Sequence, residues 1–396
     1  MKNSIDTWIE TVNSNERVWY AKRLSANDSG ATDSHQAGIY IPKIILWEIF
    51  PKTKTGSNPD SWFSTEIMPY EEKRNLRAIW YNEKTRNESR ITQWNRPSRI
   101  LDPEMTGSLV VFAFKLNSGN NPDEAVVWFC QTTEEEDAIE DIIGIVEPGE
   151  GLLFYPSGKI LVTPKIAFNE CSLADGDIPP LWLKDFPNAQ TLIALALSKR
   201  PEKFRSPDIR LINRRECETA LFYSVERASV LPRIKAGFST VDEFVNYANS
   251  VTNRRKSRAG RSLELHLKAI FDEENLHYAH GEISEGNKKP DFIFPSIEAY
   301  ANPSWPKNEL RMLAAKTTCK DRWRQILNEA DRIPVKHLIT LQQGVSENQF
   351  KEMRKANVIL VVPQSLHKSF PESVRRELLN LESFILDTQL VCGSLL

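Results

Sequence analysis

The sequence lacks the long apolar segments that enter or cross membranes. No uninterrupted apolar run reaches about 18 residues, the length that a transmembrane helix needs. The N-terminal stretch MKNSIDTWIETVNS also lacks the apolar centre of a secretory signal. We therefore expect a cytoplasmic protein with no membrane partner.

Cysteine and histidine are scarce as well. The chain has 5 cysteines and 6 histidines in 396 residues, and no Cys-x-x-Cys pair. Widely spaced cysteines in odd number are typical of reduced thiols in a cytoplasmic protein. His277 and His280 are close in sequence, but no further Cys or His ligand lies near them. We expect neither a disulfide framework nor a zinc site.

A large net charge of one sign is also absent. The 51 Lys and Arg against 53 Asp and Glu leave a net charge of −2, which excludes a protein that coats nucleic acid with its whole surface. Two local basic clusters remain, at residues 84–99 and at residues 253–261 (NRRKSRAGR). Clustered Lys and Arg suit DNA phosphates. The alternative for each cluster is a solvated loop.

The length of the chain predicts two domains, because one hydrophobic core rarely serves 396 residues. Short β-branched and aromatic runs, bounded by turn residues, predict a β-rich first part; they lie at 39–42, 109–114 and 126–129. Paired prolines in GDIPP predict a linker. The expected division is an N-terminal DNA-binding domain at 1–174, a linker at 175–183 and a catalytic domain at 184–396.

Strands and helices alternate in the second part of the chain. The run 262–271 has helical periodicity, with Leu263, Leu267 and Ile270 on one face. Further strands are predicted at 291–294, 310–318, 337–341 and 358–362, and further helices at 321–332 and 347–356. This alternation predicts an α/β domain with a mixed central sheet.

Two charged residues stand at strand ends in this second part. Asp291 begins one predicted strand after Pro290, and Lys316 lies at the end of the next. Phosphodiester hydrolysis needs carboxylates that hold a divalent cation and a basic group beside the attacking water. The common nuclease motif of this kind has a second acid two residues before the lysine, but Ala314 occupies that position. A second carboxylate must therefore come from elsewhere.

Glu329 is the predicted substitute. It follows Lys316 on the next predicted helix, where it shares a polar stripe with Arg322 beside an apolar face. That face packs the helix on the sheet, and the stripe turns Glu329 toward Asp291. Glu264, on the helix before, is a further candidate acid at the metal. The alternative is that Asp291 is a turn residue and Glu329 an ordinary surface carboxylate.

Long motifs resemble the EcoRII family of type II restriction endonucleases. KSRAGRSLELHL, EGNKKPDFIFPS and LRMLAAKTTCKDRWRQILNEADRI resemble its catalytic domain, and KRLSANDSGATDSHQAGIYIP and KTRNESRITQW its N-terminal domain. The resemblance extends from about Trp19 to Val374. It implies an N-terminal β-rich DNA-binding pseudobarrel and a C-terminal α/β restriction-endonuclease-like core. It also implies a Mg²⁺-dependent homodimer that cuts double-stranded DNA at CCWGG, before the first cytosine, and leaves 5′-phosphate ends.

The resemblance also implies roles in the catalytic domain. The catalytic residues are Asp291, Lys316 and Glu329, and the base-reading residues are Lys320, Asp321 and Arg322. Arg or Lys pairs with guanine, while an acid accepts a hydrogen bond from cytosine. The alternative for the reading segment is a plain helix N-terminus. Arg215 matches an arginine of a pocket for flipped bases, although Thr219 replaces a family tyrosine there.

In the N-terminal domain the resemblance implies a site for a second, effector copy of the target DNA. The matching residues are Lys84, Arg86, Glu88 and Arg90, while Ser89 replaces a basic family residue. His35 and Tyr40 match residues at the interface through which this domain blocks the catalytic one. The alternative role for Tyr40 is core packing in a strand.

Three other functions are weaker interpretations. GEISEGNK resembles a phosphate-binding loop only faintly, since the expected lysine is missing and a strand follows it instead of a helix. A sequence-specific DNA-binding regulator explains the first domain but has no use for the triad. A non-specific repair nuclease explains the triad but not the base-reading segment or the second DNA-binding domain.

Overall fold

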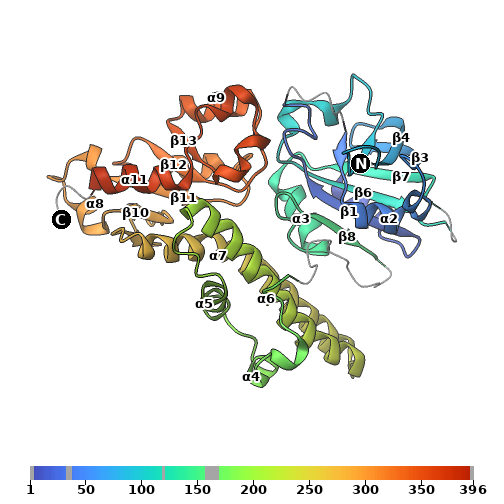
Figure 1. Ribbon diagram of the computed structural model, residues 1–396, viewed down its shortest axis with the longest axis horizontal. Helices are drawn as coiled ribbons and strands as arrows, with labels where there is room; N and C mark the ends of the chain where they lie inside the picture. Colours follow the sequence, from blue (N-terminus) through green and yellow to red (C-terminus); the bar gives the residue numbers. More distant parts are fainter. Residues whose placement is uncertain (1–3, 33–37, 118–120, 157–168, 393–396) are drawn as a thin grey trace. The chain divides into compact units, whose positions relative to one another are not determined.

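The computed structural model describes residues 4–32, 38–117, 121–156 and 169–392 (Figure 1). The chain divides into two compact units. The first comprises Met1–Lys165, Gln342–Glu352 and Lys368–Arg376; the second comprises Ile166–Leu341, Met353–His367 and Glu377–Leu396. Within the described ranges, no helix has the length and apolar character to cross a bilayer.

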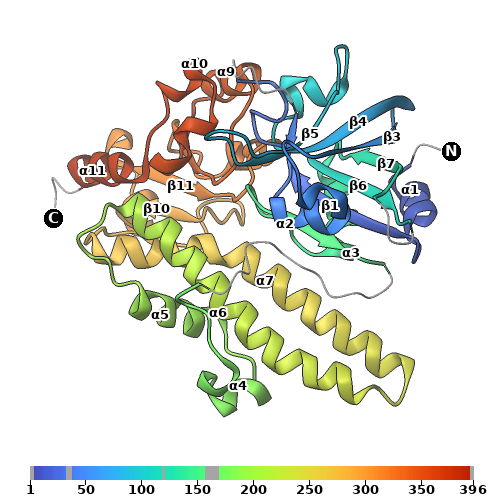
Figure 2. The same ribbon diagram turned by 45° about the vertical axis from the view of Figure 1, so that its right-hand side comes forward.

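The first unit is built on an eight-stranded sheet in the order β2-β5-β4-β3-β7-β6-β1-β8. Its strands are β1 Arg17–Arg23, β2 Ile39–Tyr40, β3 Asp60–Met68, β4 Glu72–Tyr81, β5 Glu88–Thr92, β6 Leu109–Lys115, β7 Glu124–Phe129 and β8 Gly151–Phe154. All neighbours are antiparallel except the parallel pair β3 and β7. The sheet curls (Figure 2), so that a Cβ added to Gly151 in edge strand β8 would lie 3.3 Å from Pro42, which closely follows edge strand β2.

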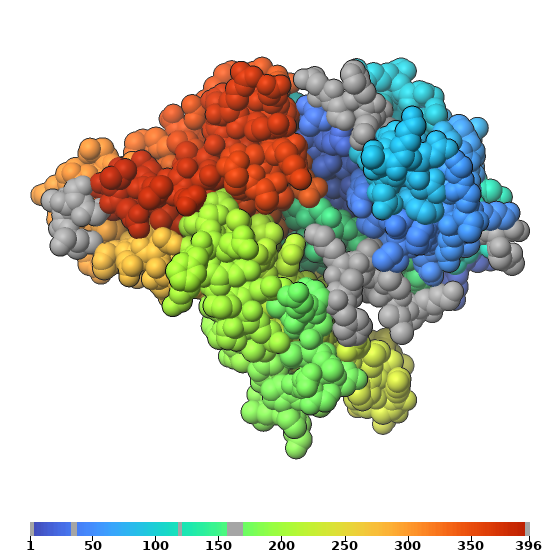
Figure 3. All heavy atoms as spheres, viewed as in Figure 1, coloured from blue at the N-terminus to red at the C-terminus, as the bar shows by residue number. Residues whose placement is uncertain are grey.

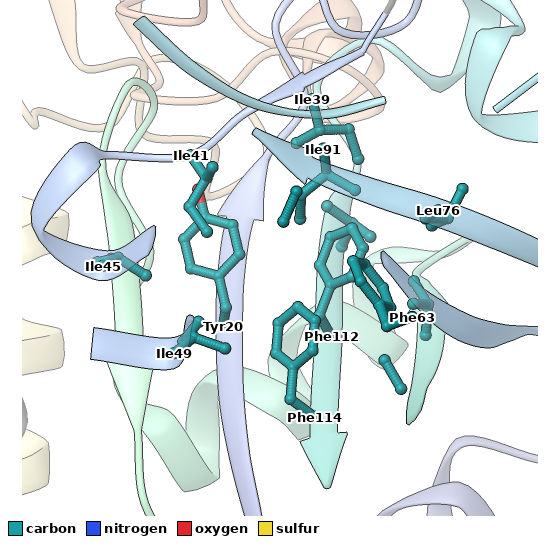
Figure 4. Packing of buried hydrophobic residues seen from close by; sticks show 14 of the residues in the cluster. Tyr20, Ile39, Ile41, Ile45, Ile49, Phe63, Leu76, Ile91, Phe112 and Phe114 are labelled. Carbon is teal, nitrogen blue, oxygen red and sulfur yellow. The ribbon is translucent and has the colours of Figure 1, made fainter. Parts of the chain in front are cut away.

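Side-chain alternation along the strands fills both faces of this sheet. Tyr20, Phe112 and Phe114 point into the core enclosed by the curl (Figure 4). Trp19 and Trp128 point to the opposite face, where they pack with α1 (Ile5–Val12) and α3 (Thr133–Ile143). The helix α2 (Lys43–Ile49) lies at the edge of the inner core. The β-rich pseudobarrel expected for the N-terminal domain is confirmed.

Two late segments of the chain belong to this first unit. The Gln343 carbonyl accepts a hydrogen bond from the backbone N of Ala26 at 2.8 Å. Ser346 Oγ donates to Glu104 Oε1 at 2.7 Å, and Gln349 Nε2 donates to the Glu104 carbonyl at 3.1 Å. We call residues 342–349 the docking segment. It continues directly from the central sheet of the second unit and contains the start of α9 (Glu347–Lys355).

The second unit has a mixed five-stranded sheet in the order β13-β12-β11-β10-β9. Its strands are β9 Ala279–His280, β10 Phe292–Phe294, β11 Arg311–Ala315, β12 Lys336–Ile339 and β13 Val358–Val361. The strands β9, β10 and β11 are antiparallel neighbours, whereas β11, β12 and β13 run parallel. The α/β core with a mixed sheet is therefore confirmed, and each predicted strand is present at about its expected place.

Two long helices dominate the rest of this unit. α6 (Pro207–Ala236) and α7 (Val241–Glu273) form a hairpin and lie side by side in Figures 1 and 2. Leu263, Leu267 and Ile270 of α7 are buried, as their spacing predicts. The other helices are α4 Pro180–Lys184, which packs beside α6 (Figure 3), α5 Ala189–Lys199, α8 Ile297–Ala301 and α11 Leu381–Cys392. The short α10 (Glu372–Arg375) belongs to the first unit.

One local prediction is wrong in this region. Cys171 and Cys217 form a disulfide between the segment before α4 and the helix α6, so the cysteines are not all reduced thiols. Both lie in one small buried cluster, which brings the two sulfurs together although they are far apart in sequence. The GDIPP stretch lies between two short helices, since the 3₁₀ helix η4 (Asp175–Asp177) ends before Ile178 and Pro180 begins α4, a first helical position that proline favours. The linker at 175–183 stays a prediction.

Candidate active site

Two charged side chains meet at one edge of the second sheet. Because β10 and β11 are antiparallel neighbours, the start of β10 lies beside the end of β11. Asp291 directly precedes β10, and Lys316 directly follows β11. Asp291 Oδ2 accepts hydrogen bonds from Lys316 Nζ at 3.2 Å and from the backbone N of Ala315 at 2.7 Å. The structure therefore brings together two of the three predicted catalytic residues.

The usual position of the second acid carries no polar group. Ala314 lies inside β11 and is fully buried. Its methyl group can neither bind a metal ion nor accept a hydrogen bond. If this edge of the sheet binds a cation through two carboxylates, the second must come from another segment.

Glu329 supplies a carboxylate close to this edge. Burial and the negative charge of Asp291 raise the pKa of Glu329 to about 7, and the positive charges of Lys316, Lys336 and Lys288 offset part of that rise. Glu329 Oε2 is buried and has no hydrogen-bond partner among the described residues. A buried carboxylate oxygen without a partner is costly unless a cation or a proton neutralises it.

Glu329 reaches this place by a route other than the predicted one. The predicted α-helix at 321–332 is wrong, since Arg322–Asn328 form the 3₁₀ helix η6 and Glu329 is extended, with φ −93° and ψ 146°. The stripe that Glu329 was predicted to share with Arg322 therefore does not exist. The buried side chains of η6 are Trp323 and Ile326. Their spacing of three residues fits a 3₁₀ turn as well as an α-helix.

The donor set at this edge fits a hard divalent cation. Within the described ranges, no group of three or more His, Cys, Asp or Glu is arranged to hold a metal. Asp291 and Glu329 nevertheless offer two carboxylates, and Glu329 Oε2 is the buried oxygen that lacks a partner. Mg²⁺ is commonly bound by one or two carboxylates and several waters. These two residues would hold such an ion.

Glu264 lies one strand away from Asp291. It projects from α7, and its Oε2 is 3.4 Å from Nε2 of His280 in β9. The His280 ring stacks on Phe292, its partner in β10, with ring centroids 4.9 Å apart. Sequence reasoning weighed His280 only as a zinc ligand and missed this contact. His280 directly precedes Gly281, whose N–H donates to the Asp291 carbonyl at 3.1 Å, so the imidazole lies close to Asp291 along the sheet.

The predicted base-reading segment lies at the surface directly after Lys316. Asp321 is exposed, and Lys320 and Arg322 are half-exposed. Asp321 is the N-cap residue of η6, but its side chain makes no capping hydrogen bond and instead accepts one from Arg324 Nη1 at 3.2 Å. The Asp321 carboxylate therefore does not cap the helix, and its exposed position leaves it accessible to a ligand.

Arg215 lies in a polar layer between α6 and α7. It is 7% exposed, and its Nε donates to Ser262 Oγ at 3.4 Å. Ser262 Oγ in turn donates to Glu218 Oε2 at 3.0 Å. Thr219, which stands in place of the family tyrosine, accepts a hydrogen bond from Arg258. Helix-to-helix hydrogen bonds thus occupy this layer where the family resemblance implies a base pocket.

The basic cluster at residues 253–261 is part of α7, so its interpretation as a loop is wrong. Arg255 Nη2 bonds Glu226 at 2.6 Å, and Arg258 Nε bonds Glu218 at 3.1 Å. Both acids lie on α6. These arginines hold the helical hairpin together and are not free to bind phosphates.

The predicted effector residues gather on the β4–β5 hairpin. Lys84 and Arg86 are exposed near its tip, and the Arg86 guanidinium lies 4.4 Å from the centre of the Tyr81 ring. Glu88 accepts hydrogen bonds from Arg86 at 2.8 Å and from Arg90 at 3.3 Å. Arg90 is only 5% exposed and donates to the Gly38 carbonyl at 2.9 Å. Arg90 thus braces the hairpin, while Lys84 and Arg86 are accessible.

Tyr40, predicted at the domain interface, has an exposed ring and a fixed backbone. Its side chain is 43% exposed, which excludes the alternative role in the core. Its carbonyl accepts hydrogen bonds from Tyr20 Oη at 3.1 Å and Lys22 Nζ at 3.2 Å, and its N–H donates to Asp28 at 2.8 Å. His35, the other predicted interface residue, lies outside the described residues.

Known sequences resemble this chain along almost its whole length. The family model described as "Restriction endonuclease EcoRII, N-terminal" matches residues 13–158, and the one described as "EcoRII C terminal" matches residues 222–385. The type II restriction enzyme EcoRII of Escherichia coli is 46% identical over 388 residues, covering 96% of this chain and 95% of that protein. The chain belongs to the EcoRII family. This EcoRII-family enzyme is a type II restriction endonuclease that cuts DNA site-specifically.

One more distant relative and one solved structure are similar to part of the EcoRII-family chain. The type II restriction enzyme SsoII of Shigella sonnei is 26% identical over 148 residues, which cover 35% of this chain and 47% of that protein. A solved structure described as metal-depleted Ecl18kI in complex with uncleaved, modified DNA is 19% identical, with a TM-score of 0.45. It covers 56% of this chain and 85% of that chain.

Proposed function

We propose that this enzyme is a Mg²⁺-dependent homodimer that hydrolyses double-stranded DNA at CCWGG, before the first cytosine, and leaves 5′-phosphate ends. The observation that carries the proposal is the meeting of Asp291, Lys316 and Glu329 at one sheet edge, with a buried carboxylate oxygen that lacks a partner. The target sequence rests on the family resemblance and on the accessible segment Lys320, Asp321 and Arg322.

Each of the three residues has a distinct part in the proposed reaction. Asp291 and Glu329 hold the divalent ion, which when bound stabilises the negative charge that develops on the scissile phosphate. Lys316 Nζ, 3.2 Å from Asp291 Oδ2, orients the attacking water beside the same carboxylate. Glu264 is a further acid near the metal, acting through His280 or after a change of its side-chain conformation.

Base recognition is assigned to Lys320, Asp321 and Arg322, which follow Lys316 within a few residues. Only a few residues separate this base-reading segment from Lys316. Correct base contacts therefore help to align the reacting groups. Arg215 is assigned to the pocket that receives flipped bases. Its use there requires the hydrogen bond to Ser262 to open or to be shared with a base.

The N-terminal domain is assigned to an effector copy of the target and to autoinhibition. Lys84, Arg86 and Glu88 on the β4–β5 hairpin offer charged groups to the effector duplex, and Arg90 supports them. The docking segment supports autoinhibition, since residues that follow the catalytic strands are built into the first unit. We assign the effector domain to residues 1–174, the connection to 175–183 and the catalytic domain to 184–396.

Cleavage of plasmid DNA tests the proposal directly. A plasmid with several CCWGG sites, incubated with the full-length protein and Mg²⁺, should give discrete fragments of the lengths that the sites predict. The same plasmid with every site altered by one base should stay intact, and a chelator should stop all cutting. A smear would indicate a non-specific nuclease, and uncut but retarded DNA would indicate a DNA-binding regulator.

A further inference from the structure

The catalytic acid Glu329 lies on a turn, not on a strand. In the common arrangement the second acid would occupy position 314 in β11, where pairing with Leu338 of β12 fixes the backbone. Glu329 instead follows the 3₁₀ helix η6, and the next residue, Ala330, has the left-handed φ of 48°. An irregular turn that must place a metal ligand accurately needs support from elsewhere in the fold.

Lys336 supports this turn from inside. It is the first residue of β12 and is 5% exposed. Its Nζ donates hydrogen bonds to the carbonyl oxygens of Glu329 at 2.5 Å, Ala330 at 2.7 Å and Ile333 at 2.7 Å. These three bonds use all three protons of the ammonium group. The turn is therefore wrapped around a buried cation that belongs to the central sheet.

Glu285 and Tyr300 support the same turn from its other side. Glu285 Oε1 accepts a hydrogen bond from the backbone N of Asp331 at 2.8 Å, and its other oxygen accepts one from Tyr300 Oη. Tyr300 Oη also accepts from the backbone N of Arg332 at 3.3 Å. Glu285 lies in the loop that leads into Asp291, so this contact joins the two segments that carry the catalytic acids.

We propose that Lys336, with Glu285 and Tyr300, positions Glu329 for metal binding and replaces the strand support that an acid at position 314 would have. None of the three is a catalytic residue, because their hydrogen bonds go to the turn and to each other. Lys336 acts through the Glu329 carbonyl, and Glu285 and Tyr300 act through the backbone of the residues that follow it. The inference rests on the proposed function, since it takes Glu329 as a metal ligand.

The decisive experiment measures metal binding and cleavage in the full-length protein carrying Lys336→Met. Mn²⁺ serves as the probe, and electron paramagnetic resonance measures the concentration of free Mn²⁺. The protein is bound to a CCTGG duplex whose linkage at the predicted cut cannot be hydrolysed. Loss of support behind a metal ligand typically lowers metal affinity or activity by about 10- to 100-fold. We expect such a drop in Mn²⁺ affinity and in kcat, with KM and duplex affinity within about twofold of wild type.

Two further variants keep the experiment decisive. Tyr300→Phe removes one hydroxyl, so it folds more readily and should weaken Mn²⁺ binding in the same direction by a few-fold. Lys22→Met is the matched control, because Lys22 is also 5% exposed but pairs with Asp28 in the first unit. It should lower the melting temperature and leave Mn²⁺ affinity unchanged, which separates positioning from general destabilisation.

Glu329→Ala separates failure of this inference from failure of the proposed function. If Glu329→Ala keeps wild-type Mn²⁺ affinity and cutting, the proposed site itself is wrong. If Glu329→Ala loses both while Lys336→Met and Tyr300→Phe keep both, only the positioning role is overturned. If Lys336→Met does not fold, wild-type Mn²⁺ affinity in Tyr300→Phe alone overturns the positioning role.

Discussion

The two carboxylates of the site are held in different ways. Asp291 is anchored at the start of β10, and its own Oδ2 accepts the backbone N–H of Ala315 in the neighbouring strand. Glu329 lies on a turn that depends on the side chains of Lys336 and Glu285. The strand-held acid is fixed by regular backbone hydrogen bonds, whereas the turn-held acid depends on a few specific side chains. The turn-held acid is therefore the more adjustable half of the site.

The largest expected effect is the loss of cutting when either acid or the lysine is removed. Asp291→Ala, Lys316→Ala and Glu329→Ala should each remove several kcal/mol of transition-state stabilisation, a rate loss above about 100-fold. Target binding should remain, because these groups serve the chemical step. Cleavage rates and gel-shift affinities on one CCWGG duplex check this. Full activity in Glu329→Ala alone would show that the turn-held acid is not the second ligand.

The next effect concerns the reading segment between the two acids. Arg322→Ala or Asp321→Ala should reduce discrimination between CCWGG and a one-base variant by about 1–3 kcal/mol per lost base contact. A residue that touches only phosphate would weaken both duplexes equally. The ratio of the two dissociation constants is the measurement, and an unchanged ratio would remove that residue from the reader.

A smaller effect is expected from the docking segment. β12 begins at Lys336, and the chain that follows it continues into residues 342–349, so one strand connects the docking segment to the lysine that bonds the Glu329 turn. Ser346→Ala removes the hydrogen bond to Glu104, worth about 0.5–1.5 kcal/mol. If docking favours the inhibited state, this variant should cut single-site DNA several-fold faster and respond less to added effector duplex.

The matched control for docking is Ser64→Ala. Ser64 lies in β3 of the same unit, and its Oγ donates to the Asp123 carbonyl at 3.0 Å, outside the docking segment. Its cleavage rate should equal that of the wild type. Slower cutting in Ser346→Ala would mean that docking supports the active state, and autoinhibition through this segment would be wrong.

The smallest effect is a pH dependence of stability in the metal-free protein. Because burial and Asp291 raise the pKa of Glu329 to about 7, the folded protein keeps this carboxyl protonated where the unfolded chain has already lost the proton. Its contribution to stability is therefore fully present below about pH 4.5 and is lost as pH rises to about 7. Urea unfolding in chelator at pH 5 and pH 8 should show a smaller decline in Glu329→Gln than in wild type.

What could be predicted from the sequence follows the same division between strand and turn. Asp291 and Lys316 flank short apolar strands, so their meeting at one edge follows from periodicity and strand pairing. The environment of Glu329 could not be predicted, because a 3₁₀ helix and an α-helix share the spacing of Trp323 and Ile326. The role of Lys336 could not be predicted from the sequence either, since a lysine at the start of a strand is ordinarily a surface residue.

Long-range pairing explains the other differences. The ion pairs of Arg255 with Glu226 and of Arg258 with Glu218 join helices α6 and α7, which lie side by side only in the folded hairpin. The Cys171–Cys217 disulfide likewise depends on one buried cluster. The sequence shows a basic run and an odd number of cysteines, but it does not show which acids pair with the arginines or which two cysteines are bonded. The family resemblance supplied the fold and the activity; the partners required the structure.

The buried methyl group of Ala314 has a consequence for how such a site can change over time. Position 314 has no exposed surface, so a glutamate introduced there would meet packed neighbours and bury an unpaired charge. Ala314→Glu therefore cannot rescue a chain that has lost Glu329. Loss of Glu329 could then not be repaired by one substitution at position 314, so the turn and its buried lysine would both have to be kept.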